Sequence, residues 1–135
     1  MTQLVRDAMV IDPAALDVSA TAQEAGEALQ RPEVRAVLVT DGGRFAGVIT
    51  RKTLVREVVA RGRDPRTTRL REIAEAPNAT VGSDTPLAQA YGFLEAGDYE
   101  RVPVVDEGRL VGVLSRSAVQ RRLQEDQPPA PADDS

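Results

Sequence analysis

The strongest constraint on the fold is an internal repeat with a period of 65 residues. Residues 37–51 read VLVTDGGRFAGVITR and residues 102–116 read VPVVDEGRLVGVLSR, so eight of fifteen positions are identical. Unrelated segments share about one such position at average residue usage. The alignment needs no gap, which predicts one supersecondary unit that occurs twice. Duplication for folding alone and duplication that builds a ligand site both fit this pattern.

Half of this chain is too small to be comfortably stable by itself. The chain has 135 residues, of which 41% are hydrophobic but only 3% aromatic. A very small domain is marginal because it buries too little apolar surface, and here Val, Leu, Ile and Ala must supply the core. We therefore expect the two halves to pack on each other.

The residue pattern predicts the same order of elements in each repeat, and hence an α+β fold. In the first repeat these are a helical turn at 5–9, a strand around Leu16, a helix at 21–30, a hairpin of strands at 37–40 and 45–50, and a helix at 51–61. In the second they are a turn at 70–74, a strand around Val81, a helix that ends near Gly97, a hairpin of strands at 102–106 and 109–115, and a helix at 116–124. Tight glycine turns between β-branched runs indicate the hairpins. Each repeat should therefore form a small, mostly antiparallel sheet with packed helices.

Several helix ends carry recognisable signals. Thr21 precedes a glutamate by three residues, which is the capping-box spacing. In the second repeat Asp84 or Thr85 is the expected cap, with Pro86 in the first turn. Gly97 is the expected stop of that helix.

These elements divide the chain into four segments. They are a first repeat at 1–62 with its N-terminal helical turn, a basic linker at 63–69, a second repeat at 70–124 and a Pro- and Asp-rich tail at 125–135. The tail has too little apolar surface to fold alone, so we expect it to be flexible.

Composition excludes several functional classes. The chain has no His and no Cys, so the usual general base, Cys nucleophile and transition-metal ligands are missing. We expect neither catalytic residues nor a metal site. The formal net charge of −4 gives no bulk attraction to nucleic acid or to an anionic membrane, and no apolar run is long enough to span a bilayer. Since the N-terminus also lacks a signal-peptide pattern, we expect a cytoplasmic protein.

Arginines gather around the linker: Arg56, Arg61, Arg63, Arg66, Arg69 and Arg71. A solvated helix end and loop explain this cluster. Nucleic-acid binding is the weaker interpretation, because no aromatic side chains alternate with the arginines for base stacking.

Short motifs recur in register along the two repeats. They are Asp7-Ala8-Met9, Val102-Pro103-Val104-Val105-Asp106, Gly47-Val48-Ile49-Thr50 and Gly112-Val113-Leu114-Ser115. With these motifs the chain resembles a tandem pair of cystathionine β-synthase (CBS) domains over residues 4–123. The resemblance implies a flat pseudo-twofold module with two clefts between its sheets. It also implies a regulatory role without a required cofactor, and AMP, ADP, ATP or S-adenosylmethionine as ligands.

The end of each hairpin is a candidate anion site. Thr50 and Ser115 lie where a strand ends and a helix begins, so each hydroxyl is expected to cap its helix and to face a ligand. The first N–H groups of such a helix suit phosphate. Arg51 and Arg116 follow directly, where a cation opposes the helix dipole by about 0.3–1 kcal/mol. An anionic ligand would explain both arginines, and solvated surface arginines inherited by duplication are the alternative.

The remaining predicted ligand contacts come from the resemblance. It places adenine against the strand edges near Val37 or Val102, with Ala79 and Thr80 lining the second site. It also implies an Asp that holds the ribose, three residues after the Thr or Ser.

At those two positions this chain has Thr53 and Ala118. Because a site without its polar partner leaves ligand hydroxyls unsatisfied, we expect recognition to shift toward phosphates. Gly47 and Gly112 either let a ligand approach the strands or make room for packing.

Phe93 extends the apolar surface of its helix. It lies roughly 120° around the helix from the core-facing Leu87. Because paired CBS modules commonly associate through their helices, we predict a homodimer with Tyr91, Phe93 and Leu94 in the interface. The alternative is that Phe93 packs under the neighbouring repeat.

Two functions of different class therefore remain. The leading one is a regulatory sensor of an adenosyl nucleotide or related anion, acting on an unidentified protein. The alternative is a dimerisation or protein-interaction module with empty clefts.

Overall fold

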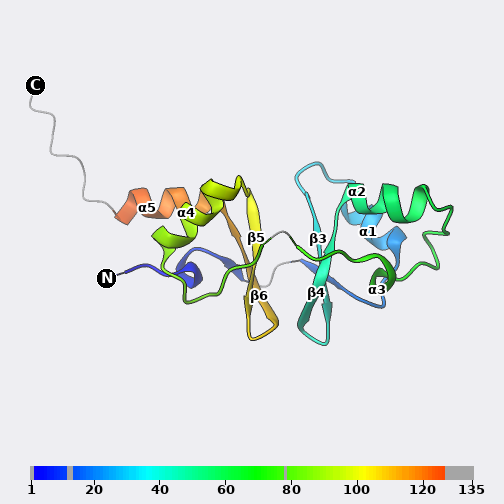
Figure 1. The fold of residues 1–135 in the computed structure, drawn as a ribbon, viewed down its shortest axis with the longest axis horizontal. Helices are drawn as coiled ribbons and strands as arrows, with labels where there is room; N and C mark the ends of the chain where they lie inside the picture. The colour runs from blue at the N-terminus through cyan, green and yellow to red at the C-terminus, as the bar shows by residue number, and fades with distance from the viewer. Residues whose placement is uncertain (1, 12–13, 78, 127–135) are drawn as a thin grey trace, which may run out of the picture.

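Two β-hairpins stand side by side at the centre of the molecule, and helices cover their outer sides (Figure 1). The computed structural model describes residues 2–11, 14–77 and 79–126. The elements up to residue 62 are a 3₁₀ turn η1 (Val5–Asp7), β1 (Val10–Ile11), β2 (Ala15–Asp17), α1 (Ala22–Ala28), β3 (Val37–Asp41), β4 (Arg44–Ile49), α2 (Arg51–Leu54) and a π-helix η2 (Val55–Val59). The later elements are α3 (Leu70–Ile73), α4 (Leu87–Gly97), β5 (Arg101–Asp106), β6 (Arg109–Ser115) and α5 (Arg116–Asp126). We call residues 15–62 the first half and residues 79–126 the second half.

The strands form one curled sheet with an approximate twofold axis at its centre. β3 and β4 are antiparallel, as are β5 and β6, while β2 runs parallel to β3 and β1 lies antiparallel to β6. The hairpins pair with each other near their tips, where Arg44 is the partner of Arg109. There the N–H of Phe45 donates to Gly108 at 2.8 Å and the N–H of Leu110 donates to Gly43 at 3.3 Å. The repeat alignment exchanges these two bonds, so the predicted α+β fold with pseudo-twofold halves is confirmed.

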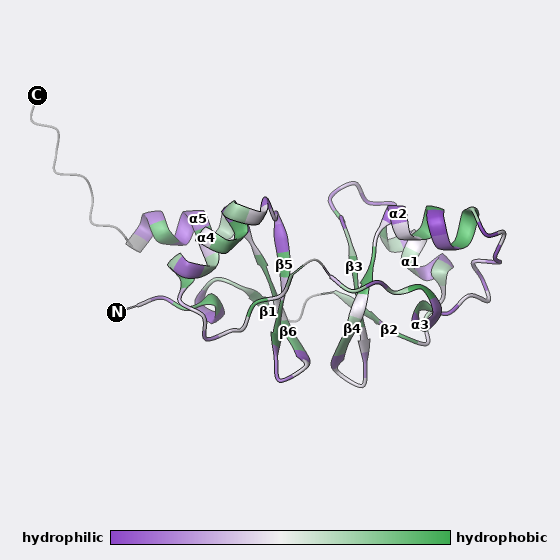
Figure 2. Cartoon of the chain, viewed as in Figure 1, coloured by the Kyte–Doolittle hydropathy of each residue, from purple (hydrophilic) through white to green (hydrophobic). Residues whose placement is uncertain are grey.

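Each half has its own aliphatic core between hairpin and helices. The first core contains Val39 and Ile49, and the second contains Val104 and Leu114, all fully buried. These are equivalent positions of the two repeats. Hydrophobic residues concentrate along the central strands, whereas hydrophilic residues mark the hairpin tips (Figure 2).

The helical turns that open the two repeats are exchanged between the cores. Val5 of η1 packs in the second core, while Leu70 of α3 packs in the first. Backbone hydrogen bonds show the same exchange. The N–H of Val5 donates to the carbonyl of Thr85, and the N–H of Leu70 donates to the carbonyl of Ala20, both at 2.9 Å. The sequence repeats are therefore not the packing units, and the two halves are interlocked.

The helix starts agree with the sequence only in part. The Thr21 side chain accepts a bond from the N–H of Glu24 at 3.2 Å, as the capping-box spacing predicts. The N-cap of α4 is Pro86, which makes no side-chain cap bond, so the predicted cap at Asp84 or Thr85 is wrong. The bond from the N–H of Leu87 to Gln3 satisfies this helix end at 2.8 Å instead.

The helix ends differ slightly from the prediction. Gly97 is the last residue of α4, and the left-handed residue that stops the helix is Asp98 with φ of 56°. Helix α5 continues to Asp126, which places the first residues of the predicted tail within the helix. The rest of that tail, 127–135, lies outside the described residues.

Candidate functional site

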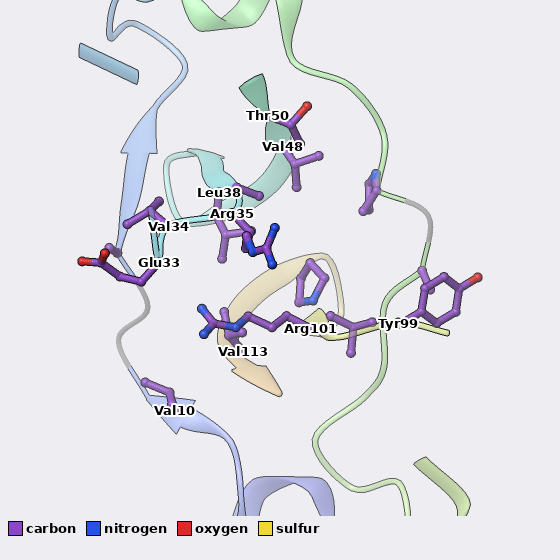
Figure 3. A pocket seen from close by; sticks show the side chains of 16 residues that line it. Val10, Glu33, Val34, Arg35, Leu38, Val48, Thr50, Tyr99, Arg101 and Val113 are labelled. Atoms are coloured by element: carbon purple, nitrogen blue, oxygen red, sulfur yellow. The ribbon is translucent and has the colours of Figure 1, made fainter. Parts of the chain in front are cut away.

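A pocket of about 470 Å³ opens where the two halves meet (Figure 3). Pockets of this size commonly hold one small-molecule ligand. Its lining residues are Val10, Ala14, Glu33, Val34, Arg35, Ala36, Leu38, Val48, Thr50, Pro77, Ala79, Tyr99, Arg101, Val102, Pro103 and Val113. Both hairpins and the segments before them therefore contribute to one continuous cavity.

The lining is largely built from equivalent positions of the two repeats. The pairs are Ala14 with Ala79, Val34 with Tyr99, Ala36 with Arg101, Leu38 with Pro103 and Val48 with Val113. Leu38 and Pro103 are buried, and the two valines of the last pair are half-buried. The pseudo-twofold axis thus passes through a pocket with an apolar floor.

Charged side chains at the pocket break this symmetry. Arg35 and Arg101 are exposed and reach over the cavity, while the Glu33 carboxylate points away from it (Figure 3). Within the described residues neither guanidinium takes part in an ion pair. Their equivalents in the other repeat are Glu100 and Ala36. The mouth of the pocket therefore carries two guanidiniums that have no arginine at the equivalent position of the other repeat.

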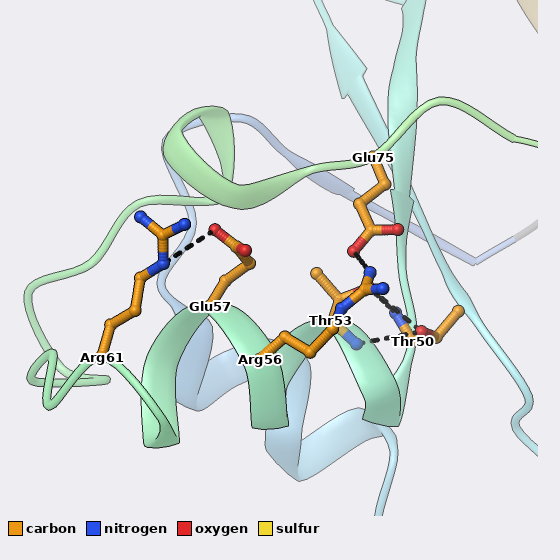
Figure 4. Close-up of polar contacts among 6 residues, drawn as sticks. All are labelled: Thr50, Thr53, Arg56, Glu57, Arg61 and Glu75. Atoms are coloured by element: carbon orange, nitrogen blue, oxygen red, sulfur yellow. Dashed lines mark hydrogen bonds and ion pairs between the residues drawn. The ribbon is translucent and has the colours of Figure 1, made fainter.

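Thr50 caps α2 through a reciprocal arrangement with Thr53 (Figure 4). The N–H of Thr53 donates to the Thr50 hydroxyl at 3.2 Å, and the N–H of Thr50 donates to the Thr53 hydroxyl at 3.0 Å. Thr50 lines the pocket, but Thr53 is fully buried. Thr53 is a capping and core residue, which corrects its prediction as a ligand contact.

The side chain of Arg51 turns away from the pocket. Its Nη2 donates to the carbonyl of Leu29 at 2.6 Å and to that of Arg31 at 2.9 Å. Leu29 is the C-cap of α1, and the carbonyl end of a helix favours a cation. Arg51 therefore holds α1 against α2, and it does not line the pocket as the anion-site prediction requires.

The equivalent residues of the second half are also bound internally. The Ser115 hydroxyl accepts from the N–H of Ala118 at 3.2 Å, so it caps α5. Arg116 pairs with Asp98 at 3.3 Å and with Glu100. Although burial works against the charge, these carboxylates raise the pKa of Arg116. Ser115, Arg116 and Ala118 all lie outside the lining of this pocket, so their predicted ligand contacts stay predictions.

The other predicted contacts divide between lining and core. Ala79 and Val102, both predicted as ligand contacts, line the pocket. Val37 is buried in the first core, and Thr80 is exposed outside the lining. The predicted residues that the structure brings together are thus Thr50, Ala79 and Val102.

The two strand glycines accommodate protein rather than ligand. A Cβ at Gly47 would lie 2.8 Å from the Glu75 carbonyl, and one at Gly112 would lie 2.8 Å from the Val10 carbonyl. The segments that follow α3 and η1 therefore cross the sheet over these glycines. Of the two roles weighed for them, room for packing is the one present.

The linker arginines mostly contact their own molecule. Three pair with carboxylates: Arg56 with Glu75, Arg61 with Glu57 at 3.6 Å, and Arg66 with Asp64 at 3.4 Å (Figure 4). The guanidinium of Arg69 donates to the Ser19 carbonyl at 2.9 Å. The hydrogen bond from Arg56 lowers the pKa of Glu75, so that carboxylate is charged at neutral pH. These contacts reduce the positive surface offered to a nucleic acid.

The three predicted interface residues differ in accessibility. Phe93 is 42% exposed and packs on Tyr99 with ring centroids 5.4 Å apart. Tyr91 is half-buried, and its hydroxyl bonds Glu95 at 2.9 Å. Leu94 is fully buried in the second core. Leu94 therefore offers no surface to a partner, which corrects its assignment.

Sequence reasoning missed Arg35 and Arg101, together with Tyr99. The signal for Arg35, Arg101 and Tyr99 is that each differs from the residue at the equivalent position of the other repeat, whereas the predicted Arg51 and Arg116 recur. The two recurring arginines, Arg51 and Arg116, make internal contacts, whereas Arg35 and Arg101, each present in one half, line the pocket.

The family of this chain follows from two matches that together cover most of its length. The CBS domain family model matches twice, at residues 5–60 and 70–125. The chain belongs to the CBS domain family. CBS pairs are regulatory modules, and the two matches here coincide with the two repeats.

Two curated relatives show how differently CBS domains are used. The chain is 34% identical to the meiotically up-regulated gene 70 protein of Schizosaccharomyces pombe over 77% of its own length, but it spans only 14% of that protein. It is 27% identical to the CBS domain-containing protein YhcV of Bacillus subtilis, and the match covers 82% of this chain and 79% of YhcV. The CBS pair therefore occurs both as most of a protein and as a small part of one.

A solved structure has the same fold with a nucleotide bound. The crystal structure of CBSX2 in complex with AMP superposes with a TM-score of 0.72 at 24% identity, covering 92% of this chain and 98% of that one. At this identity the likeness establishes the fold of the CBS pair.

The ionisable lining side chains are Glu33, Tyr99 and the two arginines. Within the described residues, no three His, Cys, Asp or Glu side chains gather as metal ligands do. In the same residues no helix combines the length and apolar character needed to cross a membrane.

Proposed function

We propose that this CBS pair is a regulatory module that binds an adenine nucleotide or a related small anion in the pocket between its halves. The observation that carries the proposal is the combination of an apolar floor with two guanidiniums at the mouth that form no ion pair within the described residues. An apolar floor suits a planar ring, and guanidinium groups bind phosphate through paired hydrogen bonds. The AMP complex of the similarly folded CBSX2 supports this ligand class.

Binding in this pocket would couple the halves. The lining belongs to both hairpins, which otherwise touch each other at their tips. A ligand that contacts both sides favours the arrangement in which the sides are closest, and shifts the population toward it. A regulated protein that contacts both halves would sense that shift.

A thermal-unfolding screen tests the proposal. AMP, ADP, ATP and S-adenosylmethionine are added separately at matched ionic strength. A ligand at about 100 times its dissociation constant stabilises the folded state by roughly 2.7 kcal/mol, which corresponds to a melting shift of several degrees for a domain of this size. If none of the four compounds moves the melting curve, the ligand-sensor proposal is wrong.

A homodimerisation module is the second candidate function, and exposed apolar side chains favour it. Val55 and Val59 of η2 are 57% and 71% exposed, and Phe93 of α4 is 42% exposed. Helices α2 and α4 lie along the same side of the molecule, the upper one in Figure 1. The repeat equivalents of the two valines are Gln120 and Gln124. Each half thus offers a different apolar surface, and a head-to-tail pair of chains would cover both.

Light scattering tests this second function. Phe93→Glu should reduce the molar mass of the wild-type dimer toward that of a monomer, because burying an unpaired charge in the interface is costly. Gln89→Glu, which places the same charge at another exposed position of α4, is the matched control. A wild-type protein that stays monomeric at high micromolar concentration contradicts the dimer.

A further inference from the structure

We propose that a groove in the first half binds residues 127–135 of a second copy of this chain, and that Arg63 pairs there with the carboxylate of Asp133 or Asp134. The groove has a volume of about 540 Å³ and lies between α1 and the residues from Leu54 to Pro65. Among the described residues it shares no lining residue with the pocket between the halves. Binding in the groove is therefore independent of the nucleotide-binding function proposed above.

The groove depends on a small residue in α1. Gly26 lines it, and the repeat alignment places Tyr91 of α4 at the equivalent position. Tyr91 is half-buried against the second core. A Cβ on Gly26 would lie 3.8 Å from the Leu54 side chain, which is an ordinary contact, and glycine within a helix is less stable than alanine. Packing inside the chain does not require this glycine, whereas space for an occupant does.

A cationic nitrogen without a partner lies in the groove. The Nη1 atom of Arg63 is buried, and it has no hydrogen-bond partner within the described residues. Such an unsatisfied donor destabilises the folded chain unless an acceptor reaches it. Neighbouring arginines do have acceptors, since Arg61 pairs with Glu57 and Arg66 pairs with Asp64. A carboxylate that enters the groove would supply the acceptor that Arg63 lacks.

Aliphatic side chains form the wall of the groove that faces α1. Leu54, Val58 and Val59 line it, and Val59 is 71% exposed. The repeat equivalent of Val59 is Gln124, which lies in the α-helix α5, whereas residues 55–59 form a π-helix. Local π-helical geometry is frequent at functional sites. An apolar wall beside a buried guanidinium suits a segment that combines small apolar residues with a carboxylate.

The segment that follows α5 has this composition. Residues 127–135 read QPPAPADDS, with three prolines and two alanines before two aspartates, and contain no basic residue. Because proline has a fixed φ, less conformational freedom is lost when such a segment docks. Helices α5 and α2 lie at opposite ends of the molecule (Figure 1). The segment therefore begins far from the groove of its own chain, and the groove of a second copy is the proposed receptor.

Fluorescence anisotropy tests the contact. A peptide of residues 127–135, labelled at its N-terminus and amidated at its C-terminus, is titrated with the whole chain carrying Asp133→Asn and Asp134→Asn, so that the chain's own segment competes less. We expect saturable binding that weakens with added salt. Arg63→Gln should weaken it by about tenfold, as loss of a charge-assisted hydrogen bond does. Gly26→Leu, which fills the groove, should abolish it.

Matched variants control for the loss of charge and for the added side chain. Arg66→Gln removes an exposed arginine of the same loop, outside the lining, and Gly92→Leu makes the same glycine replacement at an exposed position of α4. Both should bind the peptide like the parent chain. Glu27→Gln should strengthen binding, because it removes an exposed carboxylate that lines the groove and repels the aspartates. Circular dichroism establishes that all variants fold.

Nuclear magnetic resonance of the isotope-labelled whole chain tests which copy is bound. Amide signals of Val58 and Val59 should shift as the chain concentration rises, and Asp133→Asn with Asp134→Asn should remove that shift. If the two aspartates change these signals equally at every concentration, the segment binds its own chain and the second-copy assignment is wrong. A peptide that does not bind, or that binds Arg63→Gln and Gly26→Leu like the controls, overturns the groove. None of these results depends on whether a nucleotide binds in the pocket.

Discussion

Arg51 and Arg116 occupy equivalent positions in the two halves but have different partners. In the first half the guanidinium donates to two main-chain carbonyls, at 2.6 and 2.9 Å. In the second half it pairs with the carboxylates of Asp98 and Glu100. The arginine at this position therefore contacts main-chain carbonyls in the first half and carboxylates in the second half. This arginine recurs because it has a structural role in each half, although its partners differ.

At the mouth of the pocket, by contrast, the two halves carry different residues. The first half has Arg35 where the second has Glu100, and the second has Arg101 where the first has Ala36. Glu100 pairs with Arg116, whereas Arg35 and Arg101 have no ion-pair partner among the described residues. Divergence between the halves therefore coincides with the surface that a ligand would contact.

The largest effect we expect is on the interlocked cores. Leu70→Ala should lower the free energy of unfolding by about 2–5 kcal/mol, because it removes a fully buried side chain. Leu70 belongs to the second sequence repeat but packs in the first core. Amide hydrogen exchange should therefore accelerate most in β3 and β4.

Leu87→Ala is the matched control for the exchange of segments. Leu87 is also fully buried, but in the second core, so its replacement should accelerate exchange in β5 and β6. If both variants instead loosen β5 and β6, the helical turns pack with their own repeats and the interlocked description is wrong.

A smaller difference should separate the two strand glycines. Gly112→Ala should cost about 1–3 kcal/mol, because its Cβ would crowd Met9 and the Val10 carbonyl. Gly47→Ala should cost more, since it adds backbone strain at φ of 145° to a clash with the Glu75 carbonyl. Urea unfolding measures the change in unfolding free energy of both variants, provided that the slope of unfolding free energy against urea concentration stays the same. If the two variants had equal urea midpoints, a side chain at residue 47 would add no backbone strain.

The recurring arginines should differ in their response to salt. Arg51→Gln and Arg116→Gln should each destabilise by about 1 kcal/mol or less, as is usual for partly exposed charged contacts. Added salt should erase the effect of Arg116→Gln, whose partners are exposed carboxylates. The effect of Arg51→Gln should persist, because its partners are carbonyls. Thermal unfolding at low and high ionic strength decides this, and identical salt responses would contradict the two different modes of contact.

The smallest effect concerns acid stability of the second half. The Ser83 hydroxyl donates to Asp106 at 2.6 Å, its N–H donates at 2.9 Å, and these bonds lower the pKa of that carboxyl. A group with a lowered folded-state pKa stabilises above its unfolded value of about 3.9 and loses that contribution as the pH falls. Ser83→Ala should therefore be less stable than wild type at neutral pH and nearly equal to it in acid.

In the first half Val18 stands where the second has Ser83, so Val18→Ala is expected to act equally at both pH values through lost packing. Unfolding midpoints between about pH 7 and about pH 3 measure the difference, a range that spans ordinary carboxyl titration. If the destabilisation by Ser83→Ala did not depend on pH, the hydrogen bonds from Ser83 would not be what lowers the pKa of Asp106.

Much of the fold could be predicted because its signals are local. Glycine turns and β-branched runs located both hairpins, and the hydroxyl at Thr50 located the start of α2. The exchange of Val5 and Leu70 between cores could not be predicted, since either core would accept either side chain. That choice depends on how the connecting segments cross the sheet.

The candidate site was harder to predict, because it depends on where side chains point. Thr50, from its place between strand and helix, and Ala79 and Val102, from the family resemblance, were predicted as ligand contacts, and all three line the pocket. The direction of Arg51 does not follow, because the Leu29 carbonyl that binds it is brought near by the packing of α1. A charged residue at a helix start is equally compatible with a ligand and with a neighbouring helix.

The most direct test of the account is the affinity for ATP of four single variants, measured side by side by calorimetry. Arg35→Gln and Arg101→Gln replace arginines found in one half, and Arg51→Gln and Arg116→Gln replace arginines that recur. We predict that the first two weaken binding by about tenfold, as loss of a charge-assisted hydrogen bond does, while the last two bind like the wild type. Loss of binding in Arg51→Gln or Arg116→Gln, with Arg35→Gln and Arg101→Gln unaffected, would contradict it.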